Sequence, residues 1–220
     1  FASAHVSCAH PRGRTPKCST WPDLSDLSIL QIRKVILRQN LSYDNLGYVL
    51  LGKIIEAVSG QTYVVFLQKN IFEPLQMTNT GFAQYQADLA VGYDDQVYIA
   101  DQINMWVAFS AGALYSTVED LYKWDQALYT DQLVPQRVLD IMFTTQVIMP
   151  DSEGWGYGYG WMIAPDTQPG LIVHYGGING FSSVIKRYTA DKATIIILTN
   201  QQNVDPDATG NLIAKKLFGK

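Results

Sequence analysis

The sequence has few charged residues and no long apolar run, and each of these shortages excludes a class of protein. Charged residues make up 16% of the 220 positions and hydrophobic residues 47%, which is unlike the composition of disordered chains. The basic residues are scattered apart from a short stretch at 12–17, and the net charge is −4, so a nucleic-acid partner is not expected. No apolar run approaches the roughly 20 residues of a membrane span. We therefore expect a globular protein with no transmembrane segment.

Cysteine is also scarce, and both cysteines lie near the start of the chain in a segment without helical or strand periodicity. Cys8 and Cys18 share this segment with His5 and His10, and all four side chains are of types that bind zinc. Neither a Cys-x-x-Cys pair nor a helical pair of histidines is present, which favours free thiols or one local disulfide. The segment also lacks the apolar core of a secretory signal. We expect residues 1–24 to be irregular, and no metal or organic cofactor to be bound.

Apolar spacing and capping residues predict that the first two thirds of the chain is mostly helical. A helix from Asn45 is expected to end at Gly60, because glycine accepts the left-handed conformation there. Thr117, with Asp120 three residues later, is typical of a helix start. Residues 71–110 carry mixed turn and apolar signals and predict a winding loop. The remaining helices are expected over residues 27–37, from Thr62 through Leu67, and from Pro135 through Met142.

The last third changes to the two-residue period of β-strands. Strands are predicted over residues 157–163, 171–175, 181–188 and 193–199, with a closing helix over residues 207–218. The run from Ala193 to Leu198 is apolar on both faces, so this strand is expected to be central and covered by helices on each side. The predicted class is therefore α+β, with a helical lobe at 25–150 and an antiparallel sheet flanked by helices at 151–220.

Several short motifs follow one another in the order typical of one enzyme family. Tyr43-Asp44-Asn45 stands at a predicted helix start, and His174-Tyr175-Gly176-Gly177 lies in a predicted strand. The succession covers about residues 41–218 and resembles the serine β-lactamase and penicillin-binding-protein family, in particular its class C β-lactamase-like hydrolases. The other motifs that carry the resemblance are Ser59-Gly60-Gln61-Thr62, Phe72-Glu73-Pro74-Leu75, Ala111-Gly112-Ala113-Leu114, Gly180-Phe181 and Leu198-Thr199-Asn200.

The resemblance implies cleavage of a small ester, amide or peptide-like substrate by acyl transfer. In the family a serine attacks the substrate, and its lysine partner lies one helical turn away in the spacing Ser-x-x-Lys. The resemblance assigns proton transfer to Tyr43, whose pKa neighbouring cations would lower. It assigns orientation of the lysine or substrate to Asn45, and contact with the carbonyl side of the substrate to His174. The backbone near Gly176 and Gly177 would then contribute to the oxyanion hole.

Two departures from the family pattern bear on this activity. The single Ser-x-x-Lys spacing joins Ser183 to Lys186 in a predicted strand, where this offset points the two side chains to opposite faces. Ser110 lies in a segment that forms a loop near the family's site, and it is a candidate for substrate contact. Asp44 stands where relatives carry a small residue; its carboxylate would raise the pKa of Tyr43, and it too is a candidate substrate contact. The nucleophile is therefore unassigned.

Alternative functions and a mode of assembly follow from these departures. A truncated or divergent member of the family is expected, and a pocket that binds ligand without turnover is an alternative to an enzyme. Glycoside hydrolysis by paired carboxylates, Asp44 with Glu153 or Asp120, is another. The aromatic residues that could stack on sugars also fit strand packing, and they are Trp155, Tyr157, Tyr159 and Trp161. A sheet without the family's N-terminal strands would have an unpaired edge, which predicts a homo-oligomer through that edge.

Overall fold

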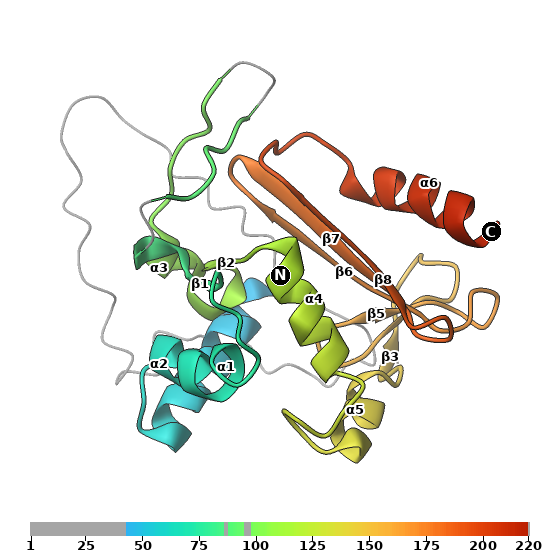
Figure 1. Cartoon of the computed structure of the whole chain (residues 1–220), viewed down its shortest axis with the longest axis horizontal. Coiled ribbons are helices and arrows are strands. Elements are labelled where there is room, and N and C mark those ends of the chain that lie inside the picture. Colours follow the sequence, from blue (N-terminus) through green and yellow to red (C-terminus); the bar gives the residue numbers. More distant parts are fainter. Residues whose placement is uncertain (1–42, 86–87, 95–97, 220) are drawn as a thin grey trace. The chain divides into compact units, whose positions relative to one another are not determined.

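A computed structural model describes residues 43–85, 88–94 and 98–219, and these residues belong to one compact unit. The irregular segment expected at 1–24, with its cysteines and histidines, and the helix expected at 27–37 lie outside the described residues. The described chain forms a group of helices, then an antiparallel sheet, then a terminal helix (Figure 1). This arrangement confirms the predicted α+β class.

The first described helix, α1 (Asn45–Ser59), begins at the predicted residue and ends at the predicted glycine. At its start, the carboxylate of Asp44 accepts a hydrogen bond from a first-turn N–H group. At its end, Gly60 takes a φ of 67°, a conformation that costs glycine little. Val49 and Gly52 are buried and form the inner face of the helix. The predicted helix is confirmed.

The helix α2 (Tyr63–Leu67) is capped by the Thr62 hydroxyl, as predicted, and a π-helical turn, η1 (Gln68–Phe72), continues it. Among the described residues, no single helix is long and apolar enough to cross a membrane, although α1 and Tyr63–Phe72 pass that test of length and composition as a bent pair. The outer face of α1 exposes several large apolar side chains, namely Leu46, Leu50, Leu51, Ile54 and Val58.

The segment expected to be a winding loop contains several short elements. Strand β1 (Gly81–Phe82) pairs antiparallel with β2 (Leu114–Tyr115), far from it in sequence. Elements this short carry too few residues for a hydrophobic period to appear, so periodicity does not predict them. Between the two strands lie the turn η2 (Ala83–Tyr85), the helix α3 (Met105–Ala108) and the turn η3 (Phe109–Ala111).

Two further helices precede the sheet. The helix α4 (Val118–Ala127) begins at Thr117, whose hydroxyl accepts a hydrogen bond from the N–H of Asp120, so the predicted start is confirmed. The helix α5 (Gln136–Met142) begins one residue later than expected, because Pro135 has an extended ψ of 142° and serves as the N-cap.

Six strands form one antiparallel sheet in chain order. The predictions for the last two strands are confirmed. The strand predicted at 157–163 is wrong, because Gly160, with a φ of 82°, turns the chain and divides the segment into two short paired strands. The strands are β3 (Val147–Ile148), β4 (Gly156–Tyr157), β5 (Met162–Ile163), β6 (Leu171–Ile178), β7 (Phe181–Tyr188) and β8 (Ala193–Thr199).

The position of β8 differs from the prediction. Within the described chain β8 pairs with β7 on one side and is the last strand of the sheet, so it is not central. Helices nevertheless cover both of its faces, as expected: α4 packs on one face and α6 (Pro206–Phe218) on the other (Figure 1). Apolar residues on both faces of β8 therefore indicate that helices cover both faces. They do not indicate how many strands pair with β8.

Two adjacent basic residues of β7 mark the two faces of the sheet. Arg187 is fully buried and bonds to Asp125 of α4, whereas Lys186 bonds to Asp207 and Asn211 of α6. Because side chains alternate along a strand and its partners, the face of Arg187 is also that of His174 on β6. His174 thus lies on the face that carries α4.

Candidate active site

The structure brings together two residues that the sequence analysis selected from distant motifs. Tyr43 directly precedes α1, and His174 lies in the middle of β6. Their ring centroids are 6.4 Å apart, and the Tyr43 ring also lies 5.6 Å from that of Tyr48 and 6.1 Å from that of Tyr157. One aromatic cluster therefore joins the start of α1 to two strands of the sheet.

Hydrogen bonds connect three members of this cluster. The Tyr48 and Tyr157 hydroxyls lie 2.8 Å apart, and the Tyr157 hydroxyl lies 3.2 Å from Nε2 of His174. On the other side of the imidazole, Nδ1 lies 2.8 Å from the carbonyl oxygen of Tyr175. Tyr48 was not predicted for the site, and Tyr157 was named only among the aromatic residues that could stack on sugars. The position of Tyr48 could have identified it as a site residue, because it lies one helical turn after Asp44 and so near the N-terminal end of the predicted helix.

Burial raises the pKa of two tyrosines in this cluster, Tyr43 and Tyr157. The pKa of Tyr43 is raised from 10.0 to about 12, first by burial and then by the neighbouring Tyr48. Burial, followed by the hydrogen bond with Tyr48, raises the pKa of Tyr157 further. The expectation that cations lower the pKa of Tyr43 is therefore wrong for the described residues, and Asp44 is not the cause of the increase. Tyr43 holds its proton at neutral pH.

The other predicted residues near α1 have local roles in the fold. Asp44 is exposed and caps the helix, and Asn45 is its first residue. The hydroxyl of Ser110 donates to the Tyr48 carbonyl at 2.8 Å, which fastens η3 to α1. At Gly52, facing it, a Cβ would lie 2.1 Å from the Ser110 hydroxyl oxygen, so the two segments meet closely. These contacts show no substrate role for Ser110, which stays a prediction.

A cleft of about 710 Å³ lies along the end of β6 that follows His174. The predicted residues Gly176 and Gly177 line it, together with Ser183 of β7 and Leu198 of β8, whereas Tyr43, Asn45 and His174 lie outside its lining. The structure thus separates the predicted residues into an aromatic cluster and an adjoining cleft.

One side of β6 is unpaired beside this cleft. Strand β5 pairs with β6 only at Ile172 and Val173, although β6 continues to Ile178. From His174 onward, that edge of β6 has no partner strand in the described part of the chain. Unpaired backbone N–H and C=O groups at a strand edge can receive an extended chain by main-chain hydrogen bonds.

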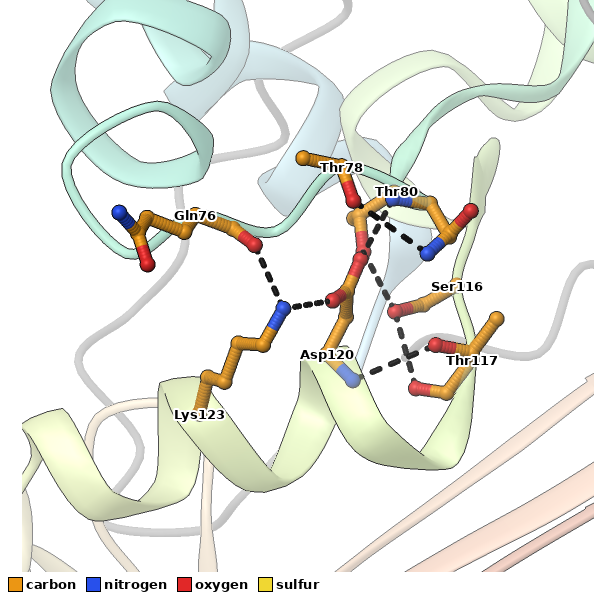
Figure 2. A network of polar contacts seen from close by, with 8 residues as sticks. Gln76, Thr78, Thr80, Ser116, Thr117, Asp120 and Lys123 are labelled. Carbon is orange, nitrogen blue, oxygen red and sulfur yellow. Dashed lines mark hydrogen bonds and ion pairs between the residues drawn. The ribbon is translucent and has the colours of Figure 1, made fainter.

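The polar contacts in Figure 2 hold one wall of the cleft in place. Asp120 of α4 is fully buried and accepts hydrogen bonds from the Asn79 N–H, the Thr80 hydroxyl and the Lys123 amine. Burial alone would raise the pKa of Asp120, but these three donors outweigh it and hold the pKa below its usual value. Thr80 also bonds to the hydroxyl of Ser116, which lines the cleft.

The serine and lysine of β7 do not form a catalytic pair. Ser183 faces the cleft, and its hydroxyl lies 3.5 Å from the Gly176 carbonyl. Lys186 points to the opposite face, where it bonds to Asp207 at 2.7 Å. This geometry confirms the prediction that the strand places the two side chains on opposite faces.

The acids proposed for glycoside hydrolysis have separate roles. Asp44 caps α1, Asp120 is buried against Lys123, and Glu153 lies exposed in a turn with a φ of 53°. The aromatic residues are divided as well, since Trp161 is buried and stacks on Trp124 at 5.7 Å. In the same described ranges, no three His, Cys, Asp or Glu side chains gather to hold a metal ion.

An antiparallel sheet flanked by helices, with a tyrosine at a helix start facing a strand histidine, is the arrangement that the motifs implied for β-lactamase-like serine hydrolases. The model of the Beta-lactamase family matches residues 14–220. The chain belongs to the beta-lactamase family.

Similar proteins include several penicillin-binding proteins. Penicillin-binding protein 4* of Bacillus subtilis (strain 168) is 31% identical over 179 residues, which are 73% of this chain and 40% of that protein. An octameric penicillin-binding protein homologue from Pyrococcus abyssi is similar in structure, with a TM-score of 0.74 and 30% identity over 82% of this chain and 43% of that one. A D-stereospecific amidohydrolase from Streptomyces sp. has a TM-score of 0.68 and 26% identity, covering 82% and 56%. This chain spans about 40% of the length of the first protein.

Proposed function

We propose that this chain supplies the substrate-orienting and proton-transfer side of an acyl-transfer site that acts on an ester or amide of peptide-like shape. The observation that carries the proposal is the unpaired edge of β6 beside His174, with Tyr43 facing the same histidine. A peptide-like substrate would align along this edge by main-chain hydrogen bonds. The D-stereospecificity named for the Streptomyces amidohydrolase suggests an amide of D configuration, such as a D-amino acid amide, as a first ligand.

The residues would divide the chemistry as follows. Tyr43, with its pKa raised to about 12, carries its proton at neutral pH and would begin as the donor to a leaving group. His174 would face the carbonyl side of the substrate, and Asn45 would orient the amide. Backbone N–H groups near Gly176 and Gly177 would stabilise negative charge on the carbonyl oxygen.

The test is a binding measurement combined with intact-mass spectrometry. The purified chain is incubated with a β-lactam, with a D-amino acid amide and with a fluorophosphonate. Because the single Ser-x-x-Lys spacing is divided between two faces of β7, we expect a non-covalent complex and no stoichiometric adduct. Binding should shift the backbone amide resonances of residues 175–177, and Tyr43→Phe or His174→Gln should weaken it.

A matched variant outside the site shows whether weaker ligand binding arises from the site or from any change of a tyrosine. Tyr122→Phe changes an exposed tyrosine of α4 and should leave binding unchanged. A folded chain that binds none of the ligands and forms no adduct would refute the proposal. An adduct mapped to one serine would overturn the expectation of binding without a nucleophile and would show turnover chemistry within this chain.

We also propose that copies of the chain associate through the edge of β8. Strand β8, with the sequence Ala-Thr-Ile-Ile-Ile-Leu-Thr, has neither the charge nor the proline that commonly protects an edge strand. The octameric homologue from Pyrococcus abyssi supports assembly in this family. Light scattering over a concentration series should show dimers or larger species, which Leu198→Lys should dissociate and Leu212→Lys on α6 should not. A monomer at high concentration would refute this proposal.

A further inference from the structure

We propose that Tyr157 is a positioning residue that holds the imidazole of His174 in one orientation, and that Tyr48 orients the Tyr157 hydroxyl in turn. The inference rests on the proposed function in one respect only, namely that His174 acts in the site. Its structural basis is the unbroken series of contacts from Tyr48 through Tyr157 and His174 to the carbonyl of Tyr175.

The direction of each hydrogen bond follows from the carbonyl at the end of the series. A carbonyl oxygen only accepts, so Nδ1 of His174 must carry the hydrogen that points to Tyr175. A neutral imidazole has one N–H, and Nε2 is then an acceptor. Tyr157 must therefore donate to Nε2, and because it has one hydrogen it accepts the hydrogen of Tyr48. Three hydrogens thus point in one direction along the series.

This direction fixes the ring of His174. Turning the imidazole over would exchange its two nitrogens and break the bonds to Tyr157 and Tyr175 together. When a proton is taken up at Nε2, that nitrogen becomes a donor to Tyr157. The Tyr157 hydroxyl then turns its hydrogen to Tyr48, whose own hydrogen turns outward. Rotation of two hydroxyl groups accommodates either charge state without movement of a ring.

The same contacts separate the roles of the tyrosines. Tyr48 and Tyr157 use their hydroxyls within the protein, whereas the Tyr43 hydroxyl makes no hydrogen bond within the part of the chain that the structure describes. Tyr43 is also 42% exposed. Its hydroxyl is thus the one in the cluster that faces a ligand, and the other two position the histidine beside it.

The proposal is tested by the nitrogen NMR resonances of the imidazole in uniformly labelled protein. The chain has three histidines, and His174→Gln identifies the resonances of His174. At a pH where the ring is neutral, we expect a protonated Nδ1 and a hydrogen-bonded acceptor Nε2. Tyr157→Phe removes the hydroxyl and keeps the ring, so the Nε2 resonance should move toward the position of an unbonded acceptor.

Two further variants sharpen the result. Tyr48→Phe leaves the donor to Nε2 in place and should give a shift in the same direction that is several-fold smaller. Tyr159→Phe alters an exposed tyrosine close to Tyr157 and should leave both nitrogens unchanged. The wild-type spectrum alone overturns the proposal if it shows a protonated Nε2, so the test holds even where Tyr157→Phe fails to fold. Unchanged nitrogens in folded Tyr157→Phe would overturn it as well.

The experiment requires neither ligand nor turnover. A chain that binds none of the acyl-transfer ligands can still show the expected nitrogen resonances, and failure of the proposed function is then distinct from failure of this inference. If the chain does bind a β-lactam, Tyr157→Phe should weaken that binding, and Tyr159→Phe should not.

Discussion

Variants of the buried ion pair between Arg187 and Asp125 test how strongly this pair joins the sheet to α4. Both side chains are fully buried, and Nε of Arg187 donates to the carboxylate at 2.5 Å. Three aromatic rings surround the guanidinium, with centroids 4.7 Å away in Tyr129, 4.8 Å in Phe143 and 5.7 Å in Trp161. Since these rings exclude water, neutralisation of the charge on Arg187 depends on Asp125.

The expected magnitude follows from this burial. Asp125→Ala leaves the guanidinium without its counter-charge and should lower the free energy of unfolding by about 3–5 kcal/mol. Arg187→Met leaves a buried carboxylate and should cost a similar amount. The double variant removes both charges, so its loss should be well below the sum of the two single losses. A stability of about 5–15 kcal/mol is typical of domains, so each single change is large.

Urea unfolding followed by circular dichroism measures these free energies. The pair between Lys53 and Glu56 is a matched control, because the lysine side chain is 41% exposed and the two residues are three apart on α1. Glu56→Ala also removes the acceptor of the Tyr63 N–H, so Lys53→Met is the better control, with an expected loss of about 0.2–1 kcal/mol. Single losses at the buried pair below about 1 kcal/mol, or additive losses in the double variant, would refute the reasoning.

Three other changes test packing and titration. Gly52→Ala would place a Cβ 2.1 Å from the Ser110 hydroxyl oxygen and should lower the free energy of unfolding in urea by about 1–3 kcal/mol. At Gly47 a Cβ would have nothing within 4 Å, so Gly47→Ala should raise that free energy by up to about 1 kcal/mol. Equal effects of the two changes would contradict the close packing at Gly52. Asp120 has a lowered pKa in the folded state, so its stabilising effect is present above its ordinary pKa of 3.8 and is lost as pH falls through the folded value. Asp120→Asn should therefore lower the free energy of unfolding at neutral pH and make it depend less on pH in the acid range. Parallel curves of unfolding free energy against pH for wild type and variant would contradict this. Tyr43 has a raised pKa, so its contribution is present below pH 10.0 and is lost as pH rises through about 12. The ultraviolet difference titration of wild type against Tyr43→Phe should have its midpoint near 12, and a midpoint at the ordinary tyrosine value would contradict burial as the cause.

Local chemical signals in the sequence were enough to predict much of the fold. Capping by Thr62 and Thr117 and the left-handed glycine at Gly60 fix the ends of helices through contacts within one turn. The alternation of side chains on β7 was equally local, and it separates Ser183 from Lys186 as expected. The roles of Tyr43 and His174 in catalysis stay predictions, although the structure brings the two rings together.

Features that depend on distant neighbours were not predictable. The apolar run of β8 reports its helical cover, but the number of adjacent strands depends on pairings that the run does not encode. The resemblance implied that cations lower the pKa of Tyr43, and the carboxylate of Asp44 was expected to raise it. Burial among Tyr48, Tyr157 and His174 raises it instead, and that burial exists only in the folded chain.

Tyr157 shows how one error in the predicted sheet concealed a residue of the site. In a single strand over residues 157–163, Tyr157 would lie at one end, and its distance from His174 would depend on the length of that strand. The turn at Gly160 instead folds β4 back on β5, which pairs with β6. The Tyr157 hydroxyl thereby reaches Nε2 of His174 at 3.2 Å. The glycine that ends the strand is therefore what lets the tyrosine meet the histidine, and a residue with a side chain at Gly160 would be strained by the φ of 82°. We expect Gly160→Val to change the nitrogen resonances of His174 as Tyr157→Phe does, and retention of the wild-type resonances would show that the turn does not control the contact.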